Sequence, residues 1–431
     1  MISARFIIVF MACVSLAFTL VKMRLADLQR KQPLPDEVAD IYDPERYQKY
    51  LNYVADNRRI GLIFTAVNLI LTVVLYYSSV FSRIETFAGR NPYGVFIATF
   101  ALFFLIETVV GIIGKYLDTF YIREKYGMNK QTMKGFVKDA VLDSVQNLVL
   151  TGSLGLIFVF IGEHLPVWTH GQPIGLGKAF LFGLAIAAAV AAFMLLAALF
   201  SLWVLKKQYT FTPMPDDALR SKIMALQEGS KKKVSLIYIY DESKKTTTKN
   251  AFLLKLLWHR EFGIADNFIN ENAETELLAV LSHEIGHLKH KKNLLNYTGY
   301  AAIGAFFCLF VWLIYRPDVI LSMNAWIRES FGITVTNYYV WISVMGAILT
   351  PVARVFTTFG NYRSRQEEHE ADREAVKNGY GEELIATFKR LSNDELINVN
   401  PHPVIEFLEY DHPGMYQRIR AIREYEAMRK A

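Results

Sequence analysis

The sequence is poor in cysteine and in charged residues, and both shortages limit what the protein can be. The two cysteines, Cys13 and Cys308, lie in apolar runs, which excludes a disulfide framework and a cysteine-based zinc site. Charged residues make up 20% of the 431 residues, whereas soluble domains average about 25%. Internal repeats and low-complexity tracts are also missing. With 52% hydrophobic residues, this composition excludes disorder, collagen and coiled-coil arrays, and it argues against a purely soluble protein.

What the sequence has instead is long apolar runs. A membrane-spanning helix needs about 20 mostly apolar residues. Seven stretches qualify as predicted spans: 2–21, 61–80, 93–114, 147–162, 177–205, 297–315 and 333–356. The first is interpreted as a retained helix rather than a signal peptide, because Lys22 and Arg24 follow the apolar run. We therefore predict a predominantly α-helical, multi-pass integral membrane protein whose seven transmembrane helices lie in a lipid bilayer.

The distribution of lysine and arginine predicts the orientation of these helices. The connections 22–60 and 115–146 contain eight and six of these residues, whereas 81–92, 163–176 and 316–332 contain two, none and two. By the positive-inside rule the basic connections are cytosolic, so the N-terminus lies outside and the C-terminus lies in the cytosol. The net charge of +6 is explained by this topology, and no nucleic-acid partner is expected.

The predicted spans divide the chain into four segments. They are 1–205, with five transmembrane helices and the cytosolic loops 22–60 and 115–146; 206–296, a cytosolic α/β segment; 297–356, with helices six and seven; and 357–431, a cytosolic helical tail. The two long polar segments lie on the same side of the membrane and are expected to form one domain of helices plus a small β-sheet.

Within the segment 206–296, apolar alternation and turn residues predict individual elements. Strands are expected at 234–240 and 250–257, and a hairpin around Gly263 is expected within 260–270. A helix is expected at 273–290. The tail is expected to be helical, with breaks near its prolines Pro401, Pro403 and Pro413.

The helix expected at 273–290 contains the stretch HEIGH, from His283 to His287. A spacing of four places both imidazoles on one face of a helix, where they can bind one Zn²⁺. Glu284 is offset by one position, so its carboxylate can reach a metal-bound water and act as the general base. This H-E-x-x-H pattern on a helix predicts a zinc peptidase site.

A catalytic zinc also needs a third protein ligand and one open coordination position. His290 is interpreted as a solvated residue, because the glycine of the metzincin pattern is missing before it. The carboxylates within 364–372 offer the other known solution. Glu368 and Asp372 fit the pattern E-x-x-x-D, in which the Asp accepts the free N–H of a ligating imidazole. We therefore predict one Zn²⁺ per chain, with Glu368 beside the two histidines and Asp372 behind them.

The two motifs and the predicted spans together resemble a known family. HEIGH lies just before the sixth of seven predicted spans, and SRQEEHEAD runs from Ser364 to Asp372. In this combination nearly the whole chain resembles the type I CAAX prenyl proteases, which are integral-membrane zinc metallopeptidases of the gluzincin kind. Their pattern S-R-x-x-E-F-x-A-D implies that its first Glu, here Glu368, is the third zinc ligand. This sequence has His369 where the family usually has Phe, and His369 is interpreted as inert.

The stretch Asn250-Ala251-Phe252 resembles the N-A-[FY] edge strand of the same family. The resemblance implies that these three residues bind extended substrate near the zinc, with Asn250 on the substrate backbone. An edge strand can pair with an incoming peptide by β-augmentation, which depends little on the peptide's side chains.

The stretch YDHPGMYQR, residues 410–418, resembles the family pattern Y-x-H-P-x-x-x-x-R. The resemblance implies that His412 and Arg418 are catalytic residues that face the active site. They would polarise the scissile carbonyl or stabilise its oxyanion.

The resemblance implies a zinc metalloendopeptidase that cleaves peptide or protein substrates, with a large chamber enclosed by the membrane helices. Asn68 and Glu107 lie in or beside apolar runs and are expected to face the interior of the bundle. Two substrate classes stay open, namely prenylated CAAX peptides and membrane proteins or other peptides. We expect a bacterial-type enzyme of the cytoplasmic membrane, with the endoplasmic reticulum membrane as the location in a eukaryotic cell.

Two alternatives belong to different classes of protein. A quality-control protease of the heat-shock zinc protease type would usually have fewer membrane helices. An inactive membrane scaffold would have lost a ligand or the base, whereas His283, Glu284, His287 and Glu368 are all present.

Overall fold

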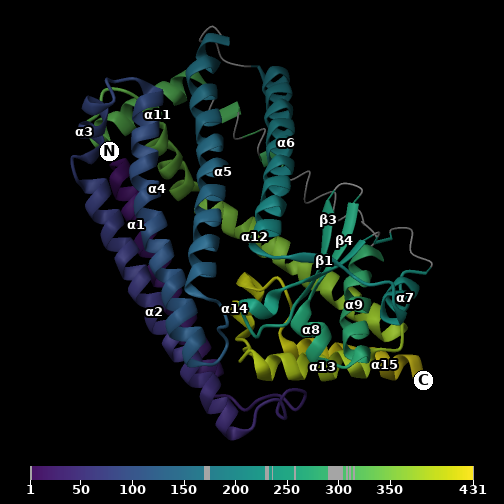
Figure 1. The fold of residues 1–431 in the computed structure, drawn as a ribbon. Coiled ribbons are helices and arrows are strands. Elements are labelled where there is room, and N and C mark those ends of the chain that lie inside the picture. The colour runs from purple at the N-terminus through teal and green to yellow at the C-terminus, as the bar shows by residue number, and fades with distance from the viewer. Residues whose placement is uncertain are drawn as a thin grey trace.

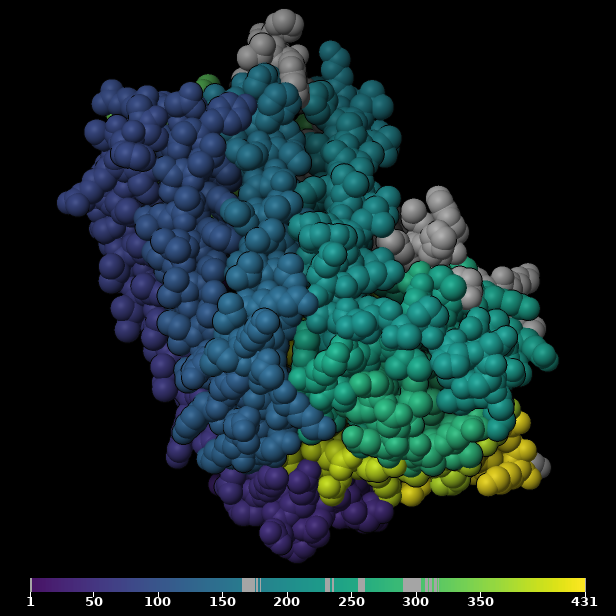
Figure 2. All heavy atoms as spheres, in the orientation of Figure 1, coloured from purple at the N-terminus to yellow at the C-terminus, as the bar shows by residue number. Residues whose placement is uncertain are grey.

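The structure, a computed structural model, describes residues 2–168, 175–228, 233–234, 236–256, 259–289 and 316–430, with a few more between 304 and 313. It has two parts: a set of long helices and, at one end of them, a part that combines a small sheet with shorter helices (Figure 1). The N-terminus lies at the far end of the long helices, and the C-terminus lies in the part with the sheet. Figure 2 shows that the two parts meet in one continuous surface.

In the described part of the chain, six helices are long and apolar enough to cross a membrane. They are α1 (Ala4–Gln29), α2 (Pro44–Tyr77), α4 (Pro92–Tyr116) with its π-helical continuation η1 (Leu117–Arg123), α5 (Met133–Trp168), α6 (Leu176–Gln208) and α12 (Tyr338–Lys377). No more than 22% of the residues in each apolar window are buried inside the protein, so a bilayer must cover the rest. The multi-pass class and six of the predicted spans are confirmed. The predicted span 297–315 lies largely outside the described residues.

Two short helices, α3 (Val80–Phe87) and α11 (Pro317–Phe331), lie at the end of the long helices away from the sheet (Figure 1). Phe81 and Phe331 meet edge to face in a buried cluster, with ring centroids 5.0 Å apart. The backbone N–H of Ala4 donates to Ser330 Oγ at 2.9 Å, which fixes the start of α1 at this end.

The long helix α12 joins the two parts. Its first turns, with Val340 and Val344, are buried in the cluster shared with α1 and α11. Its last turns pack against α9 (Glu274–Lys289) and α13 (Gly381–Asp394), where Ala375 and Val376 are buried. Side chains on the second half of α12 therefore lie in the part with the sheet.

The sheet has four strands, in the order β1-β2-β4-β3. The strands are β1 (Phe211–Pro213), β2 (Leu236–Tyr240), β3 (Ala251–Leu256) and β4 (His259–Ala265). β2 and β4 are parallel, whereas the β1–β2 and β3–β4 pairs are antiparallel. β3 is thus an edge strand of the described sheet, and β2 and β3 agree with the strands expected at 234–240 and 250–257.

The hairpin predicted around Gly263 is wrong. Gly263 lies inside β4, where it pairs with Phe252 of β3 and Tyr238 of β2. A Cβ at Gly263 would lie 2.4 Å from the Phe252 ring, so the glycine makes room for that ring rather than forming a turn. The residues after β4 form the helix α8 (Asp266–Glu271) instead of a second strand.

The remaining described elements are α7 (Ala218–Ala225), the 3₁₀ turn η2 (Glu242–Lys244), α14 (Pro403–Glu409) and α15 (Met415–Lys430). The expected helix at 273–290 is α9, and the tail is helical with interruptions at its prolines, as predicted. α9 is buried on two sides, because Ala279 belongs to the core shared with α13 and α15 whereas Leu281 and Ile285 belong to the core beneath the sheet. This burial holds α9 rigidly beside α12.

Candidate active site

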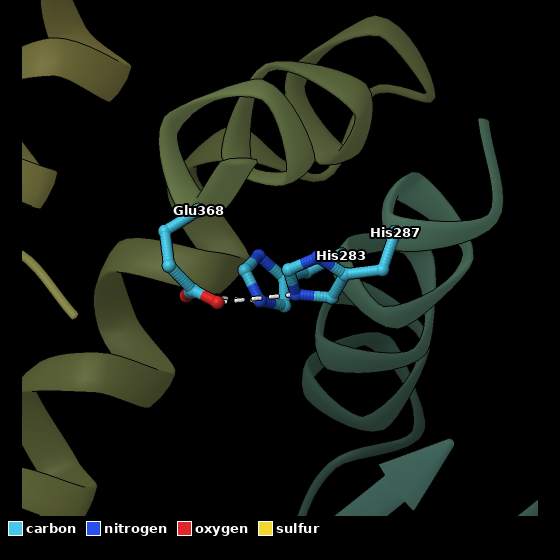
Figure 3. A group of neighbouring side chains, drawn as sticks. All are labelled: His283, His287 and Glu368. Carbon is cyan, nitrogen blue, oxygen red and sulfur yellow. Dashed lines mark ion pairs between the residues drawn. The ribbon is translucent and has the colours of Figure 1, made fainter. Parts of the chain in front are cut away.

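The structure brings three predicted metal ligands together between α9 and α12. His283 and His287 lie one turn apart on α9, with ring centroids 4.8 Å apart, and Glu368 reaches them from α12 (Figure 3). His287 Nε2 lies 3.2 Å from Glu368 Oε1, and His283 Nε2 lies 3.5 Å from Glu368 Oε2. One ligand atom from each residue lies within 4.8 Å of the other two, so the three residues can hold a metal ion.

A glycine allows α9 and α12 to approach so closely. Gly286 stands directly before His287, and a Cβ at this position would lie 2.7 Å from the Cα of Ala371 on α12. A backbone atom cannot turn away as a flexible side chain could. Gly286 is therefore required for the helix spacing that places Glu368 opposite the two histidines.

Asp372 and Arg418 lie behind the ligands, on the side away from solvent. His283 Nδ1 is 2.8 Å from Asp372 Oδ1, which fixes the ring with its Nε2 atom toward Glu368. Both oxygens of Asp372 also accept from Arg418, at 2.9 and 2.6 Å. Although burial lowers the pKa of Arg418, the nearby carboxylates, Asp372 foremost and Glu368 and Glu284 as well, together raise it, so the buried guanidinium keeps its charge.

Arg418 is thus buried behind the metal ligands, on the side away from the solvent from which a substrate would enter. Its Nη2 atom is 3.4 Å from Glu368 Oε2, and its guanidinium stacks 4.2 Å from the centre of the Phe388 ring. Only 7% of Arg418 is exposed. The position favours a role in holding Asp372 and Glu368, and the predicted contact of Arg418 with substrate stays a prediction.

His412 approaches the same cluster from the opposite, solvent-exposed side. Its Nε2 atom lies 3.5 Å from Glu368 Oε1, and its Nδ1 atom lies 2.9 Å from Asp411 Oδ1. The side chain is 57% exposed, so a substrate can reach it. Glu284, which follows His283 on α9, is half-buried.

The edge strand β3 packs against α9, and its edge opposite β4 pairs with no strand among the described residues. The carbonyl of Asn250 accepts from the N–H of Ala265 at 2.9 Å, so the backbone of Asn250 faces β4. Because backbone groups alternate along a strand, the N–H and C=O groups of Ala251 and Leu253 face the other way. The side chain of Asn250 is exposed, whereas Phe252 packs over Gly263.

Comparisons with known proteins agree with this arrangement. Residues 24–201 match a family described as CAAX prenyl protease N-terminal, five membrane helices, and residues 214–426 match peptidase family M48. The chain belongs to the CAAX prenyl protease family of M48 peptidases. It is therefore an integral-membrane metallopeptidase of a family of zinc proteases.

Individual relatives cover almost the whole length of this M48 peptidase. A CAAX prenyl protease 1 homolog from Oryza sativa subsp. japonica is 23% identical, over 92% of both chains. CAAX prenyl protease 1 from Saccharomyces cerevisiae is 24% identical, over 90% of this chain and 88% of that protein. The crystal structure of S. mikatae Ste24p shares the fold, with a TM-score of 0.78, 21% identity, and coverage of 98% of this chain and 99% of that one.

The membrane part of the M48 peptidase contains cavities lined by both apolar and polar side chains. One of about 490 Å³ is lined by Asn68, Tyr76, Glu107 and Tyr339 among others. A second, of about 290 Å³, is lined by Glu107 and Asn147. Asn68 and Glu107 therefore line half-open spaces between the long helices, and their position in an enclosed chamber stays a prediction.

A half-buried carboxyl group, that of Glu395, lies next to the start of the edge strand and predicts a pH effect on stability. Glu395 Oε1 accepts the backbone N–H of Lys249 at 3.1 Å, and burial raises the pKa of Glu395 to about 7 from its ordinary value of 4.5. Between these values the folded M48 peptidase binds more protons than the unfolded chain, so its free energy of unfolding falls as the pH rises from about 4.5 to about 7. We expect Glu395→Gln to remove this part of the slope in denaturation experiments across that range. Identical slopes in both proteins would contradict the assignment.

Sequence reasoning missed two residues that the structure places close to the site. Arg365 and Glu406 are 8% and 3% exposed and bind the backbone around His412. Arg365 is the Arg of the quoted S-R-x-x-E pattern, but the pattern alone gives no partner for it. Glu406 had no motif to indicate it.

Proposed function

We propose that the protein is a zinc metalloendopeptidase with one Zn²⁺ bound by His283, His287 and Glu368. The observation that carries this proposal is the convergence of the three donors, whose ligand atoms lie within 4.8 Å of one another. Glu368 Oε2 is buried and makes no hydrogen bond among the described residues, although His283 Nε2 and Arg418 Nη2 lie 3.5 and 3.4 Å from it, so it remains available as a ligand atom. Two histidines and one glutamate are a catalytic zinc set that leaves a fourth position open. When bound, the ion would supply Lewis acidity and a water of lowered pKa.

The roles of the protein's own side chains follow from their positions. Glu284 would accept a proton from the attacking water and pass it to the nitrogen of the leaving amine. His412 would donate from Nε2 to the oxyanion of the attacked carbonyl, while Asp411 holds the ring at its Nδ1 atom. Asp372 and Arg418 would hold His283 and Glu368 in place during this reaction.

A peptide substrate would add to the sheet at β3. The free backbone groups of Ala251 and Leu253 would hydrogen-bond to the peptide's main chain, and the exposed Asn250 side chain would reach it as well. Binding through backbone groups places an extended substrate across α9 without demanding particular side chains.

The substrate class that we propose first is a prenylated C-terminal CAAX peptide. The relatives from Oryza sativa and Saccharomyces cerevisiae are named as CAAX prenyl protease 1 or its homolog. The cavities inside the helix bundle could receive part of an apolar chain. Other peptides and membrane proteins are the second class, which the geometry of the site serves equally well.

We propose that the catalytic part and the C-terminus lie in the cytosol and that the N-terminus lies outside. This is supported by the basic connections 22–60 and 115–146, and by the position of the N-terminus at the far end of the bundle. We also propose the bacterial cytoplasmic membrane as the location, or the endoplasmic reticulum membrane in a eukaryotic cell.

The function and the substrate class can be tested together. The detergent-purified full-length protein is incubated with matched peptides, with and without a farnesyl group on a CAAX cysteine, and the products are identified by mass spectrometry. Zinc-dependent cleavage that requires the farnesyl group would support the CAAX substrate. Equal cleavage of both sets would support a general peptidase, and no cleavage by the zinc-loaded protein would contradict the enzymatic proposal.

The helix spacing at Gly286 gives a further prediction. Gly286→Ala puts a Cβ against the Ala371 backbone, and such overpacking typically costs about 1–3 kcal/mol. We expect the helices to separate and the dissociation constant for zinc, measured by chelator competition, to rise on the order of tenfold. Gly360→Ala on α12 is the control, because no atom lies within 4 Å of its added Cβ. Unchanged zinc affinity in the Gly286 variant would contradict the role of this glycine.

The two alternatives are not favoured by any observation in the described residues. A protease of the heat-shock type is not expected to match the five-helix N-terminal family description over residues 24–201. An inactive scaffold has no need for the supported ligand set of His283, His287 and Glu368.

A further inference from the structure

The loop between α14 and α15, residues 410–414, carries His412 to the metal cluster. Asp411 and His412 are exposed in this loop, whereas Pro413 and Gly414 are buried. The loop lies outside any helix or strand, and its end residues Tyr410 and Gly414 hydrogen-bond to the backbone of the flanking helices, whereas His412 lies between them. Other contacts must therefore keep His412 Nε2 at its position 3.5 Å from Glu368 Oε1.

Arg365 binds the N-terminal end of this loop. Its buried guanidinium donates to the backbone carbonyls of Glu406 at 3.0 Å and Phe407 at 3.4 Å, and to that of Tyr410 as well. The Glu406 carbonyl also accepts the N–H of Tyr410 at 3.1 Å. Carbonyls in the last turn of a helix generally lack a partner within the helix, so Arg365 adds to the hydrogen bonds at the end of α14 and fixes the direction in which the chain leaves it. Arg365 lies on α12, one turn before Glu368.

Glu406 binds the C-terminal end of the loop. Its Oε1 atom accepts from the backbone N–H of Gly414 at 2.9 Å, and its Oε2 atom accepts from Gln417 Nε2 at 3.0 Å. Glu406 is on α14 and Gln417 is on α15, so this carboxyl joins the two helices across the loop. Only 3% of Glu406 is exposed.

We propose that Arg365 and Glu406 are positioning residues that fix His412 relative to the metal ligand Glu368. The proposal rests on the proposed function, in which His412 stabilises the oxyanion. Because one helix carries both Arg365 and Glu368, a single rigid element sets the place of the ligand and the place of the oxyanion donor. Neither positioning residue needs to touch the substrate.

The kinetic effect should fall on turnover. A displacement of about 1 Å can cost on the order of 10²-fold in rate, because the donor no longer meets the oxyanion. We expect Arg365→Gln to lower kcat on the order of 10- to 100-fold. KM and zinc content should change less than twofold or so, since the edge strand and the three ligands are untouched.

A double-mutant cycle separates positioning from general stability. The measured set is the wild type, Arg365→Gln, His412→Ala and the double variant, each with its kcat, zinc content and melting temperature. If Arg365 acts through His412, its substitution costs little once His412 is gone, so the two losses are not additive. Additive losses would overturn the proposal. Wild-type turnover by His412→Ala alone would instead contradict the proposed role of His412, which keeps the two failures distinct.

An exchange of residues at positions 406 and 417 tests the contact of Glu406 with the C-terminal end of the loop. It provides an independent test if the Arg365 variant does not fold. Glu406→Gln places an amide against the amide of Gln417 and should lower kcat. In the double variant Glu406→Gln with Gln417→Glu, residue 406 becomes the donor and residue 417 the acceptor. This double variant should recover most of the lost kcat. No recovery, together with an unchanged melting temperature, would overturn the proposal. Arg363→Gln is the control and is expected to behave as the wild type. Like Arg365→Gln, it removes one positive charge from α12, but the interaction that it removes is a 3.8 Å pair with Glu367.

Discussion

Replacing Glu284 with Gln is expected to lower peptide-bond hydrolysis by a factor on the order of 10² to 10⁴, with zinc content unchanged. The amide has nearly the same shape as the carboxylate but cannot accept a proton from the attacking water. Glu284 is not one of the three residues whose ligand atoms converge, so the ion should bind as before. The loss should therefore appear in kcat and not in metal occupancy.

The measurement is peptide cleavage followed by mass spectrometry, with zinc determined by elemental analysis of the same samples. Glu367→Gln is a matched control, because the Glu367 side chain is 46% exposed, lies beside a ligand in sequence and, in the part of the chain that the structure describes, makes a long pair of 3.8 Å with Arg363. Cleavage at the wild-type rate by the zinc-loaded Glu284 variant would show that another group is the base.

The ligand residues could be predicted because their signals are local. His283 and His287 lie four positions apart on one helix, and Glu368 and Asp372 lie four apart on another, so helical geometry alone places each pair on one face. Membrane spans are equally local, because an unbroken run of about 20 apolar residues is long enough to cross the bilayer as one helix. The resemblance added what local spacing cannot give, namely that the two helices meet.

What the sequence could not give depends on contacts between distant residues. Gly263 was interpreted as a turn, since nothing local indicates that the Phe252 ring lies over it. The sequence pattern likewise gives no sign of the bidentate contact of Arg418 with Asp372, 46 positions away. The partners of Arg365 are backbone carbonyls about 40 positions away, which carry no side-chain signature at all.

The second large effect concerns the buried pair of Asp372 and Arg418. Asp372→Leu leaves the Arg418 guanidinium buried without its carboxylate, which typically costs on the order of 3–5 kcal/mol. Replacing both residues, Asp372→Leu with Arg418→Met, also removes the guanidinium that has lost its bidentate partner and should recover most of that stability. The comparison is made by thermal unfolding in a chelator, because bound zinc would itself stabilise the folded state.

Zinc affinity should not follow stability in this series. Both proteins that lack Asp372 lose the acceptor at His283 Nδ1, which typically costs 10- to 100-fold or so in metal affinity. The Arg418→Met variant keeps Asp372 as the acceptor at His283 Nδ1. This variant should therefore bind zinc more tightly than the two variants that lack Asp372, although its Asp372 has lost the contact with Arg418. If the double variant regained zinc affinity together with stability, Asp372 would serve only as the partner of Arg418. A double variant that is stable but binds zinc weakly would establish that Asp372 orients the metal-binding histidine.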